Sequence, residues 1–146
     1  MNTFIFTPGI WIGEGKISFS ASSEFIKFYT KWDVKKERKG VIKATQAVEL
    51  QGADEILINT FTFYEMKENS FKVTLENNQV ESVQGTGVRD EKTVAWEFKG
   101  HPECEGFEVY EMQENGDYFL HAEYGTPPHY RNTIEGLIWL KTNLEN

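Results

Sequence analysis

Apolar and polar residues alternate along most of this chain, the pattern expected of β-strands that bury one face. Between residues 10 and 20, for example, one face carries Trp11, Gly13, Gly15, Ile17 and Phe19. Strands of this kind are predicted over residues 10–20, 25–34, 41–50, 55–66, 71–75, 80–88, 94–98, 106–113, 118–124 and 130–140. The pattern therefore predicts about ten strands at spacings of roughly 8–14 residues.

Turn residues separate these strands. Asn77–Asn78 and Pro127–Pro128 interrupt the alternation, and Asn115–Gly116 predicts a tight hairpin with a type I′ turn. No long window shows helical periodicity, and residues 22–27 would hold at most one helical turn. The prediction is one all-β domain over residues 1–146, an antiparallel up-and-down β-barrel of about ten strands, because closure leaves no exposed sheet edge. A two-sheet sandwich is the alternative.

Composition narrows the range of functions. Of the 146 residues, 39% are hydrophobic and 26% are charged, which suits a soluble chain with a buried core. The net charge of -8 argues against nucleic-acid binding, and no apolar run approaches the length of a membrane-spanning helix. The single cysteine, Cys104, excludes an intramolecular disulfide and a multi-cysteine metal site. Residues 1–6 show no export signal and no lipidation motif is present, so the expected location is the cytoplasm.

The first predicted strand opens with the sequence GIWIGEG at residues 9–15. This opening resembles the G-x-W start of the calycin superfamily, which includes lipocalins, fatty-acid-binding proteins and nitrobindin-like barrels. The resemblance implies a calycin-like barrel that binds a small ligand in its lumen, with Trp11 closing one end. It also implies a basic residue packed over the Trp11 ring, for which Arg131 and Lys141 are available. Fatty-acid-binding relatives hold a carboxylate with a lumen arginine, and Arg131 falls in the corresponding region.

The same resemblance raises the question of haem. Nitrobindin-like proteins bind haem through a histidine near the C-terminal end of the barrel. Residues 134–140 contain no histidine, and the nearest, His129, lies beside Pro128 in an expected loop. Haem is therefore not expected, and no other cofactor is predicted.

Five polar residues interrupt strands that are otherwise apolar: Gln46, Thr60, Thr62, Tyr64 and Tyr110. A ligand pocket is mostly apolar and has a few polar groups that orient the ligand. The same pattern also fits hydroxyl ladders on an outward face. Alternation alone does not choose between these interpretations, because a shift of one residue in register exchanges the two faces.

Catalytic and metal-binding patterns are weak. None of the three histidines forms a metal-ligand pair, so no metal site is predicted. His121 is expected to face solvent, but in the opposite register it would join Glu123 in the lumen as the best acid–base pair of the chain. Cys104 lies between Glu103 and Glu105, whose charges raise a thiol pKa and disfavour a nucleophile. No catalytic residue is assigned.

Two charged runs are interpreted as solvated surface. The acidic run comprises Glu103, Glu105, Glu108, Glu111, Glu114 and Asp117. The basic run comprises Lys31, Lys35, Lys36, Arg38, Lys39 and Lys43, at one expected hairpin. The alternative for the basic run is a patch for an anionic ligand, a membrane surface or an acidic partner.

These features favour a binding protein, rather than an enzyme, for a small apolar or amphipathic molecule, which carries a carboxylate if Arg131 faces the lumen. The expected ligand-binding residues are Trp11, Gln46, Thr62, Tyr64, Tyr110 and Arg131. One alternative is a barrel filled by its own aromatic side chains that acts as an interaction module, and another is an isomerase or lyase that uses His121 and Glu123. Ile10, Ile12 and Ile138 are expected on the outer face, where they would support a homodimer.

Overall fold

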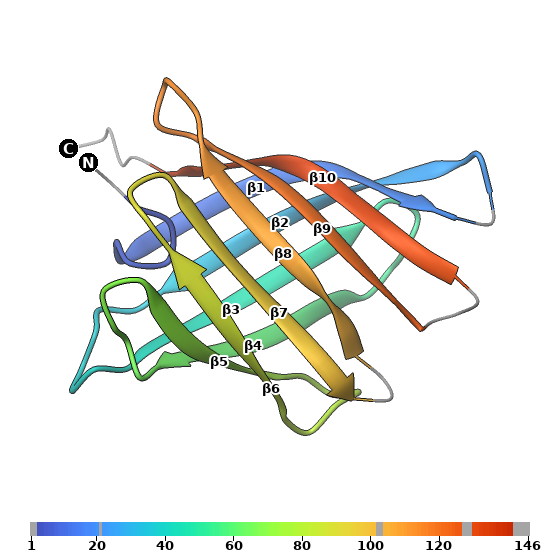
Figure 1. Cartoon of the computed structure of the whole chain (residues 1–146). Coiled ribbons are helices and arrows are strands. Elements are labelled where there is room, and N and C mark those ends of the chain that lie inside the picture. Colours follow the sequence, from blue (N-terminus) through green and yellow to red (C-terminus); the bar gives the residue numbers. More distant parts are fainter. Residues whose placement is uncertain (1–2, 21, 102–103, 127–129, 142–146) are drawn as a thin grey trace.

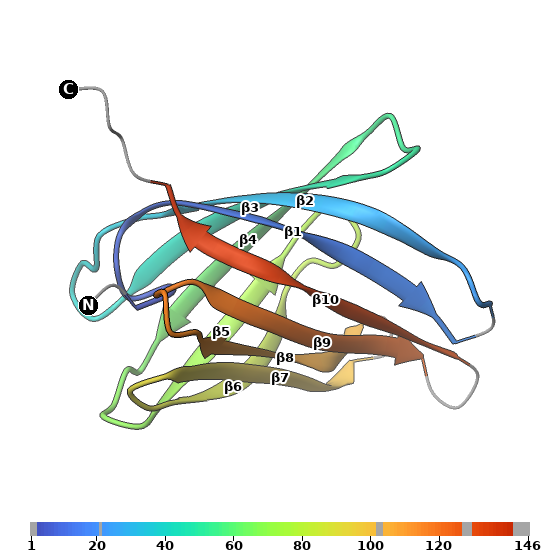
Figure 2. The same cartoon turned by 90° about the horizontal axis from the view of Figure 1, so that it is seen from above.

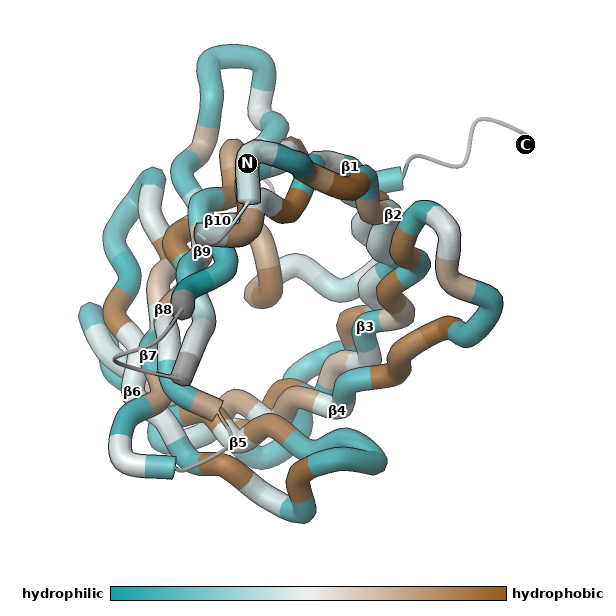
Figure 3. The backbone as a smooth tube through the Cα atoms, turned by 90° about the vertical axis from the view of Figure 1, so that its right-hand side faces the viewer, coloured by the Kyte–Doolittle hydropathy of each residue, from teal (hydrophilic) through white to brown (hydrophobic). Residues whose placement is uncertain are grey.

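The structure, a computed structural model, describes residues 3–20, 22–101, 104–126 and 130–141. It contains ten strands and, within these residues, no helix. The strands are, in chain order, β1 (Gly9–Phe19), β2 (Phe25–Val34), β3 (Ile42–Leu50), β4 (Ile56–Tyr64), β5 (Ser70–Glu76), β6 (Val83–Arg89), β7 (Thr93–His101), β8 (Cys104–Met112), β9 (Tyr118–Thr126) and β10 (Tyr130–Leu140). Consecutive strands pair antiparallel and β10 pairs with β1, so the sheet closes into an up-and-down barrel (Figure 1, Figure 3). The predicted barrel is confirmed, and the sandwich is excluded.

The register determines which side chains enter the barrel. Strands β10, β1 and β2 lie side by side along one wall (Figure 2). On β1 the side of Trp11 and Gly13 is buried, whereas Glu14 is exposed. On β2 the neighbour Trp32 is buried and Lys31 is exposed. The face of the first predicted strand that carries Trp11 and Gly13 therefore points into the barrel.

Two local predictions are wrong. The loop after β8 has three residues between Gln113 and Asp117, and Gly116 alone among them has a positive φ, of 93°. A type I′ turn would require positive φ at Asn115 as well, so the loop is a three-residue hairpin closed by a left-handed glycine. The short helical turn considered for residues 22–27 is also absent, because β2 already begins at Phe25.

Aromatic side chains fill a large part of the interior. The largest fully buried side chains include Trp11, Trp32, Trp96, Tyr110, Tyr118, Phe4, Phe61, Phe63 and Phe98. Ring centroids lie 5.0 Å apart between Trp32 and Phe61, and 5.2 Å apart between Trp96 and Tyr110. These separations are those of favourable tilted and edge-to-face pairs. The barrel is thus filled, over part of its length, by its own side chains.

The segment of residues 3–7 folds into the end of the barrel where β1 begins (Figure 1). Phe4 and Ile5 are fully buried, and the Phe4 ring lies 5.2 Å from the Trp11 ring and 4.5 Å from that of Tyr110. The Trp11 indole donates a hydrogen bond of 3.1 Å to the carbonyl oxygen of Thr7. Ile5 has a φ of 60°, which is costly for a β-branched residue and is held by its burial. We call this segment the plug, and this end the plug end.

Strands β1 and β10 approach each other closely at Gly15 and Gly136, which are register partners. A Cβ atom on Gly15 would lie 2.1 Å from the carbonyl oxygen of Glu135. Only glycine fits such an approach, so Gly15 permits the bend of the wall and does not leave room for a ligand.

Candidate functional site

The end of the barrel opposite the plug, which we call the open end, is less completely buried. Inward side chains there keep part of their surface exposed; they are Ile17, Phe19, Ile26, Gln46, Val48, Leu50, Leu57, Asn59, Tyr124, Asn132 and Ile134. A side chain on the inner face of a closed barrel is accessible only from the interior or the rim. Solvent therefore reaches these inward side chains from the open end of the barrel or its rim.

A row of three carboxamides crosses the wall beside these apolar side chains. Asn59 Nδ2 donates to Gln46 Oε1, and Asn77 Nδ2 donates to Asn59 Oδ1, each at 2.9 Å. Asn77 Oδ1 also accepts backbone hydrogen bonds from Gln79 and Val80, so the row holds the loop between β5 and β6. Val80 is buried in this position. The row is a polar feature of the interior, formed by side chains from β3, β4 and the segment after β5.

A second polar feature of the interior is a buried carboxyl group. Glu108 of β8 is only 9% exposed and shares the inner face with Tyr110. The Tyr110 hydroxyl donates to Glu108 Oε1, and the Tyr124 hydroxyl donates to Oε2 at 2.6 Å. The interpretation of Glu108 as part of a solvated acidic face is therefore wrong. We call Glu108, Tyr110 and Tyr124 the acid–tyrosine cluster.

Burial dominates the proton affinities in this cluster. It raises the pKa of Glu108 above the ordinary 4.5, although the hydrogen bonds from Tyr110 and Tyr124 oppose the shift. The Trp96 indole N–H also favours the charged carboxylate, although no hydrogen bond of acceptable geometry joins the two groups. Burial, followed by the neighbouring Glu108 charge, raises the pKa of both tyrosines well above 10.0. The tyrosines therefore remain hydrogen-bond donors to the carboxyl group.

Several buried polar atoms of the interior have no protein partner. Among the described residues these include Thr30 Oγ1, Trp32 Nε1 and Trp96 Nε1. Trp32 is the register partner of Gln46, and Trp96 is that of Glu108, so both indoles adjoin the polar features of the interior. Buried polar groups are nearly always hydrogen-bonded, and water or a bound molecule would supply the missing partners.

Three of the predicted ligand-binding residues lie inside the barrel. Gln46 belongs to the carboxamide row, and Tyr110 belongs to the acid–tyrosine cluster. Trp11 lies under the plug, where its ring packs against Phe4 and Tyr118. The structure brings together Tyr110 and Trp11 through Phe4, which contacts both rings.

The other three predicted residues lie on the outer face. Arg131 alternates with inward Asn132 and donates from Nε to Glu123 Oε1 at 2.9 Å. Thr62 and Tyr64 alternate with the buried Phe61 and Phe63 of β4. Thr62 pairs with Thr74 across the strands, as in an outward hydroxyl ladder.

Arg131 does not pack over Trp11 either. Trp11 pairs with Leu140 at the far end of β10, nine positions from Arg131, which corresponds to roughly 30 Å of extended strand. The expectation of Arg131 as a cap on the Trp11 ring is therefore wrong. Phe4 of the plug covers that ring instead.

His121 and Glu123 also face outward, as expected for His121. His121 Nε2 lies 3.1 Å from Glu123 Oε2, and its Nδ1 lies 3.2 Å from Glu135 Oε2. The hydrogen bond to Glu123 is the main reason for the raised pKa of His121, and that from Arg131 is the main reason for the lowered pKa of Glu123. The outward register removes the basis for a lumen acid–base pair of His121 and Glu123.

Other candidate groups have simple outcomes. Burial and the nearby Glu108 charge raise the pKa of Cys104 to about 11, which agrees with an unreactive thiol. His129 lies outside the described residues. Within the described ranges, no group of three or more His, Cys, Asp or Glu side chains is placed to hold a metal ion. No helix of the described part of the chain is long and apolar enough to cross a membrane.

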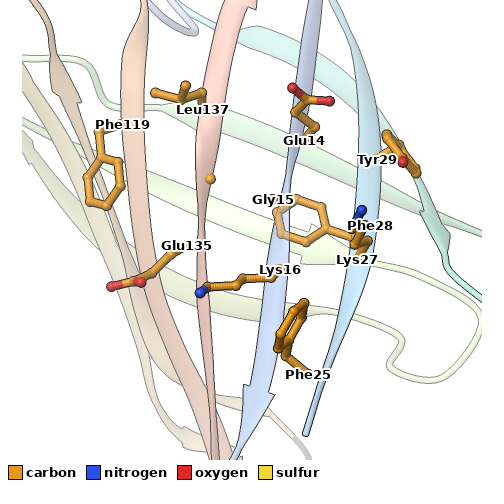
Figure 4. A pocket seen from close by; sticks show the side chains of 11 residues that line it. Glu14, Gly15, Lys16, Phe25, Lys27, Phe28, Tyr29, Phe119, Glu135 and Leu137 are labelled. Atoms are coloured by element: carbon orange, nitrogen blue, oxygen red, sulfur yellow. The ribbon is translucent and has the colours of Figure 1, made fainter.

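The outer wall carries a groove of about 520 Å³ over β9, β10, β1 and β2, shown in Figure 4. Its apolar side chains include Phe25, Tyr29, Phe119 and Leu137, which are between 36% and 51% exposed. We call it the outer groove. Ile10 and Ile12 lie on the same outer face and are half-buried, but Ile138 is buried inside the barrel, so its expected outward position is wrong.

The basic run forms the hairpin between β2 and β3. Arg38 and Val41 exchange backbone hydrogen bonds around Lys39 and Gly40, whose φ values are 54° and 78°. A second groove, of about 420 Å³, is lined by Lys35, Lys36, Arg38, Val41 and Lys43. The hairpin lies at the plug end, away from the exposed inward side chains.

Sequence reasoning missed Glu108, Asn59 and Asn77. In β8 the outward residues Phe107 and Val109 are more apolar than the inward Glu108, so hydrophobicity pointed to the wrong face. The useful signal was that Glu108 and Tyr110 are two residues apart, because residues at this spacing point to the same face of a strand. Asn59 is likewise two residues from the buried Phe61 in β4, so the two side chains point to the same face.

No protein family model matches this chain, and no curated protein is significantly similar to it in sequence.

Proposed function

We propose that this protein is a calycin-like, cytoplasmic binding protein that takes one small, largely apolar molecule into the open end of its barrel. The observation that supports this most directly is the partial exposure of inward aliphatic side chains at that end, Ile17, Ile26 and Ile134 among them. At the plug end, by contrast, the inward rings of Trp11 and Trp32 are fully buried. A barrel that is closed at the plug end and accessible at the open end suits encapsulation of a ligand.

Polar groups in the interior would orient the bound molecule. Of the residues predicted from the sequence, Gln46 and Tyr110 stay in this proposal because they face inward. Trp11 is fully buried and packs at the closed plug end. Arg131 bonds to Glu123 on the outer face and is not part of the proposed site. A carboxylate on the ligand was expected only if Arg131 faced the lumen, so the ligand is no longer expected to carry one.

Binding of the neutral dye Nile red tests the proposal, with a matched pair of variants on β4. Leu57 faces the open end and is half-buried, whereas its neighbour Ile58 is 50% exposed on the outer face. A tryptophan at position 57 would fill the space that a ligand needs, but one at position 58 would not. We expect Leu57→Trp to weaken Nile red binding by about tenfold or more and Ile58→Trp to leave it unchanged.

Circular dichroism and a thermal melt establish that each variant is folded before its binding is compared. No enhancement of Nile red fluorescence by the wild-type protein would contradict the proposal. So would equal loss of binding in both folded variants, because the dye would then lie on the outer surface.

A second candidate function is self-association through the outer groove. Apolar side chains of Phe25, Tyr29, Phe119 and Leu137 surround it, and carboxylates (Glu14, Glu135) and ammonium groups (Lys16, Lys27) lie between them (Figure 4). Two copies related by a two-fold axis can place such charges of opposite sign against each other. Sedimentation velocity is the test: a dimer that Leu137→Glu dissociates supports this function, and a wild-type monomer at high concentration excludes it.

A further inference from the structure

We propose that the molecule bound in the lumen carries an amine, whose ammonium group pairs with the carboxylate of Glu108 between Tyr110 and Tyr124. This inference rests on the proposed lumen binding and adds the chemical class of the ligand to it. The acid–tyrosine cluster, its aromatic surroundings and the charge of the interior each contribute to the argument.

Position makes the cluster available to a ligand. Tyr124 of β9 is half-buried, shares the inner face with Asn132 of the open end, and hydrogen-bonds Glu108. Glu108 therefore lies one hydrogen bond away from a side chain that is partly exposed. A ligand whose polar head enters first would leave its apolar part among Ile17, Ile26 and Ile134.

Geometry orients the carboxyl group. Each of its two oxygens accepts one phenolic hydrogen bond, from Tyr110 and from Tyr124. An oxygen of a carboxylate has two lone pairs, so each still has acceptor capacity for an ammonium N–H. The donors thus hold the group in place without saturating it, which is how a preorganised binding group is built.

Charge decides between an amine and other polar heads. No ion pair among the described residues involves Glu108, so its charged form lacks a counter-ion there. A buried carboxylate without a partner is costly, and a ligand ammonium would supply that partner. A ligand carboxylate would supply no such partner, and the charged form of Glu108 would repel it. The net charge of -8 further favours the approach of cations over anions.

Aromatic rings around the cluster add to this preference. Trp96, whose register partner is Glu108, lies 5.2 Å from the Tyr110 ring, centroid to centroid. Aromatic faces attract cations, and cages of aromatic rings recognise ammonium ligands. A neutral alcohol would gain neither the ion pair nor the cation–π contact.

Displacement of Nile red by three ligands of equal chain length, octylamine, octanol and octanoate, tests the inference at pH 7. We expect octylamine to displace the dye at about tenfold lower concentration than octanol, and octanoate to be the weakest. Glu108→Gln should remove the preference for octylamine while octanol still displaces the dye. Glu123→Gln on the outer face of the neighbouring strand is the control for surface charge and should keep the preference.

The outcomes separate the two proposals. If Nile red does not bind at all, lumen binding itself is wrong. If it binds but octylamine and octanol displace it equally, or if folded Glu108→Gln keeps the preference, the amine assignment is wrong. The wild-type ranking of the three ligands decides the matter even if Glu108→Gln does not fold.

Discussion

The two ends of the barrel are built from the same ten strands and differ in what occupies the space between them. At the plug end, the inward positions carry large rings such as Trp11 and Trp32, and Phe4 fills the remaining volume. At the open end, the inward positions carry the smaller Ile17 and Ile26, which stay partly exposed. The comparison shows that one alternating pattern produces either fully buried inward side chains or partly exposed ones, depending on how completely the enclosed volume is filled.

The plug is the second difference between the ends. It adds a ring from outside the strand pattern, so Trp11, Trp32, Tyr110 and Tyr118 all contact Phe4 within 6.1 Å, centroid to centroid. This packing closes the barrel at the plug end. The carboxamide row lies toward the open end, whereas the acid–tyrosine cluster extends from Tyr110, which contacts Phe4 of the plug, to the half-buried Tyr124.

Removing the plug ring should have the largest effect on this contrast. Phe4→Ala deletes a ring with no exposed surface, and we expect it to lower the free energy of unfolding by about 3–5 kcal/mol. Phe25→Ala, at a position 51% exposed on the outer wall, should change it by no more than about 0.5 kcal/mol. Urea denaturation followed by intrinsic fluorescence measures both, and a loss below about 1 kcal/mol in Phe4→Ala would show that the packing at this end does not depend on the plug.

Breaking the carboxamide row should have a smaller effect. Asn59→Ala removes two hydrogen bonds and leaves Gln46 and Asn77 without those partners, at an expected cost of about 1–3 kcal/mol in the free energy of unfolding. Asn69→Ala, at an exposed position, is the matched control and should be near neutral. Equal effects of the two variants in urea denaturation would mean that the row contributes nothing to the stability of the open end.

The acid–tyrosine cluster should give stability a pH dependence of defined sign. The raised pKa of Glu108 means that the folded state holds its proton more tightly than the unfolded state. The contribution of Glu108 to the free energy of unfolding is therefore complete below about pH 4.5. It is lost as the pH rises through the pKa of the folded state, with a slope of at most about 1.4 kcal/mol per pH unit. Glu108→Gln should flatten this decline.

Glu123 provides a control of opposite sign for that pH series. Its pKa is lowered, mainly by the hydrogen bond from Arg131, so its contribution is present above about 4.5 and lost as the pH falls through the folded value. Glu123→Gln should therefore leave the decline that starts near pH 4.5 in place. It also removes the partner that raises the pKa of His121, whose contribution is lost only as the pH rises above 6.5, so the variants are compared at lower pH. Thermal melts from about pH 4 to 6.5 compare the variants, and an unchanged decline in Glu108→Gln would refute the assignment to Glu108.

The smallest effect is expected for Arg131, on the outer face. Because its ion pair with Glu123 is partly exposed, Arg131→Ala should change the free energy of unfolding by less than about 1 kcal/mol. Nile red affinity should stay the same, since the side chain does not enter the lumen. A marked loss of dye binding in this variant would return Arg131 to the ligand site and overturn the separation of inner and outer residues.

The sequence was informative where alternation was strict. The inward face of β1, the number of strands and the closed antiparallel barrel all follow from a period of two with frequent turns. Tyr110 and Gln46 were identified as polar residues within apolar strands, and both lie inside the barrel. Thr62 and Tyr64 had the same signature and lie outside, because a polar side chain at a strand position fits both faces.

Alternation could not identify the acid–tyrosine cluster. Glu108 and Tyr124 belong to different strands, and only pairing of β8 with β9 brings their side chains together. The plug was also invisible to the pattern, because residues 3–7 are not part of a strand and Phe4 finds its partners on β1, β2, β8 and β9. Local periodicity reports which side of a strand is apolar, but contacts between strands depend on register and barrel closure. A buried acid among tyrosines and a closed plug end are therefore properties of the closed barrel, whereas the strands that form it can be read from the order of apolar and polar residues.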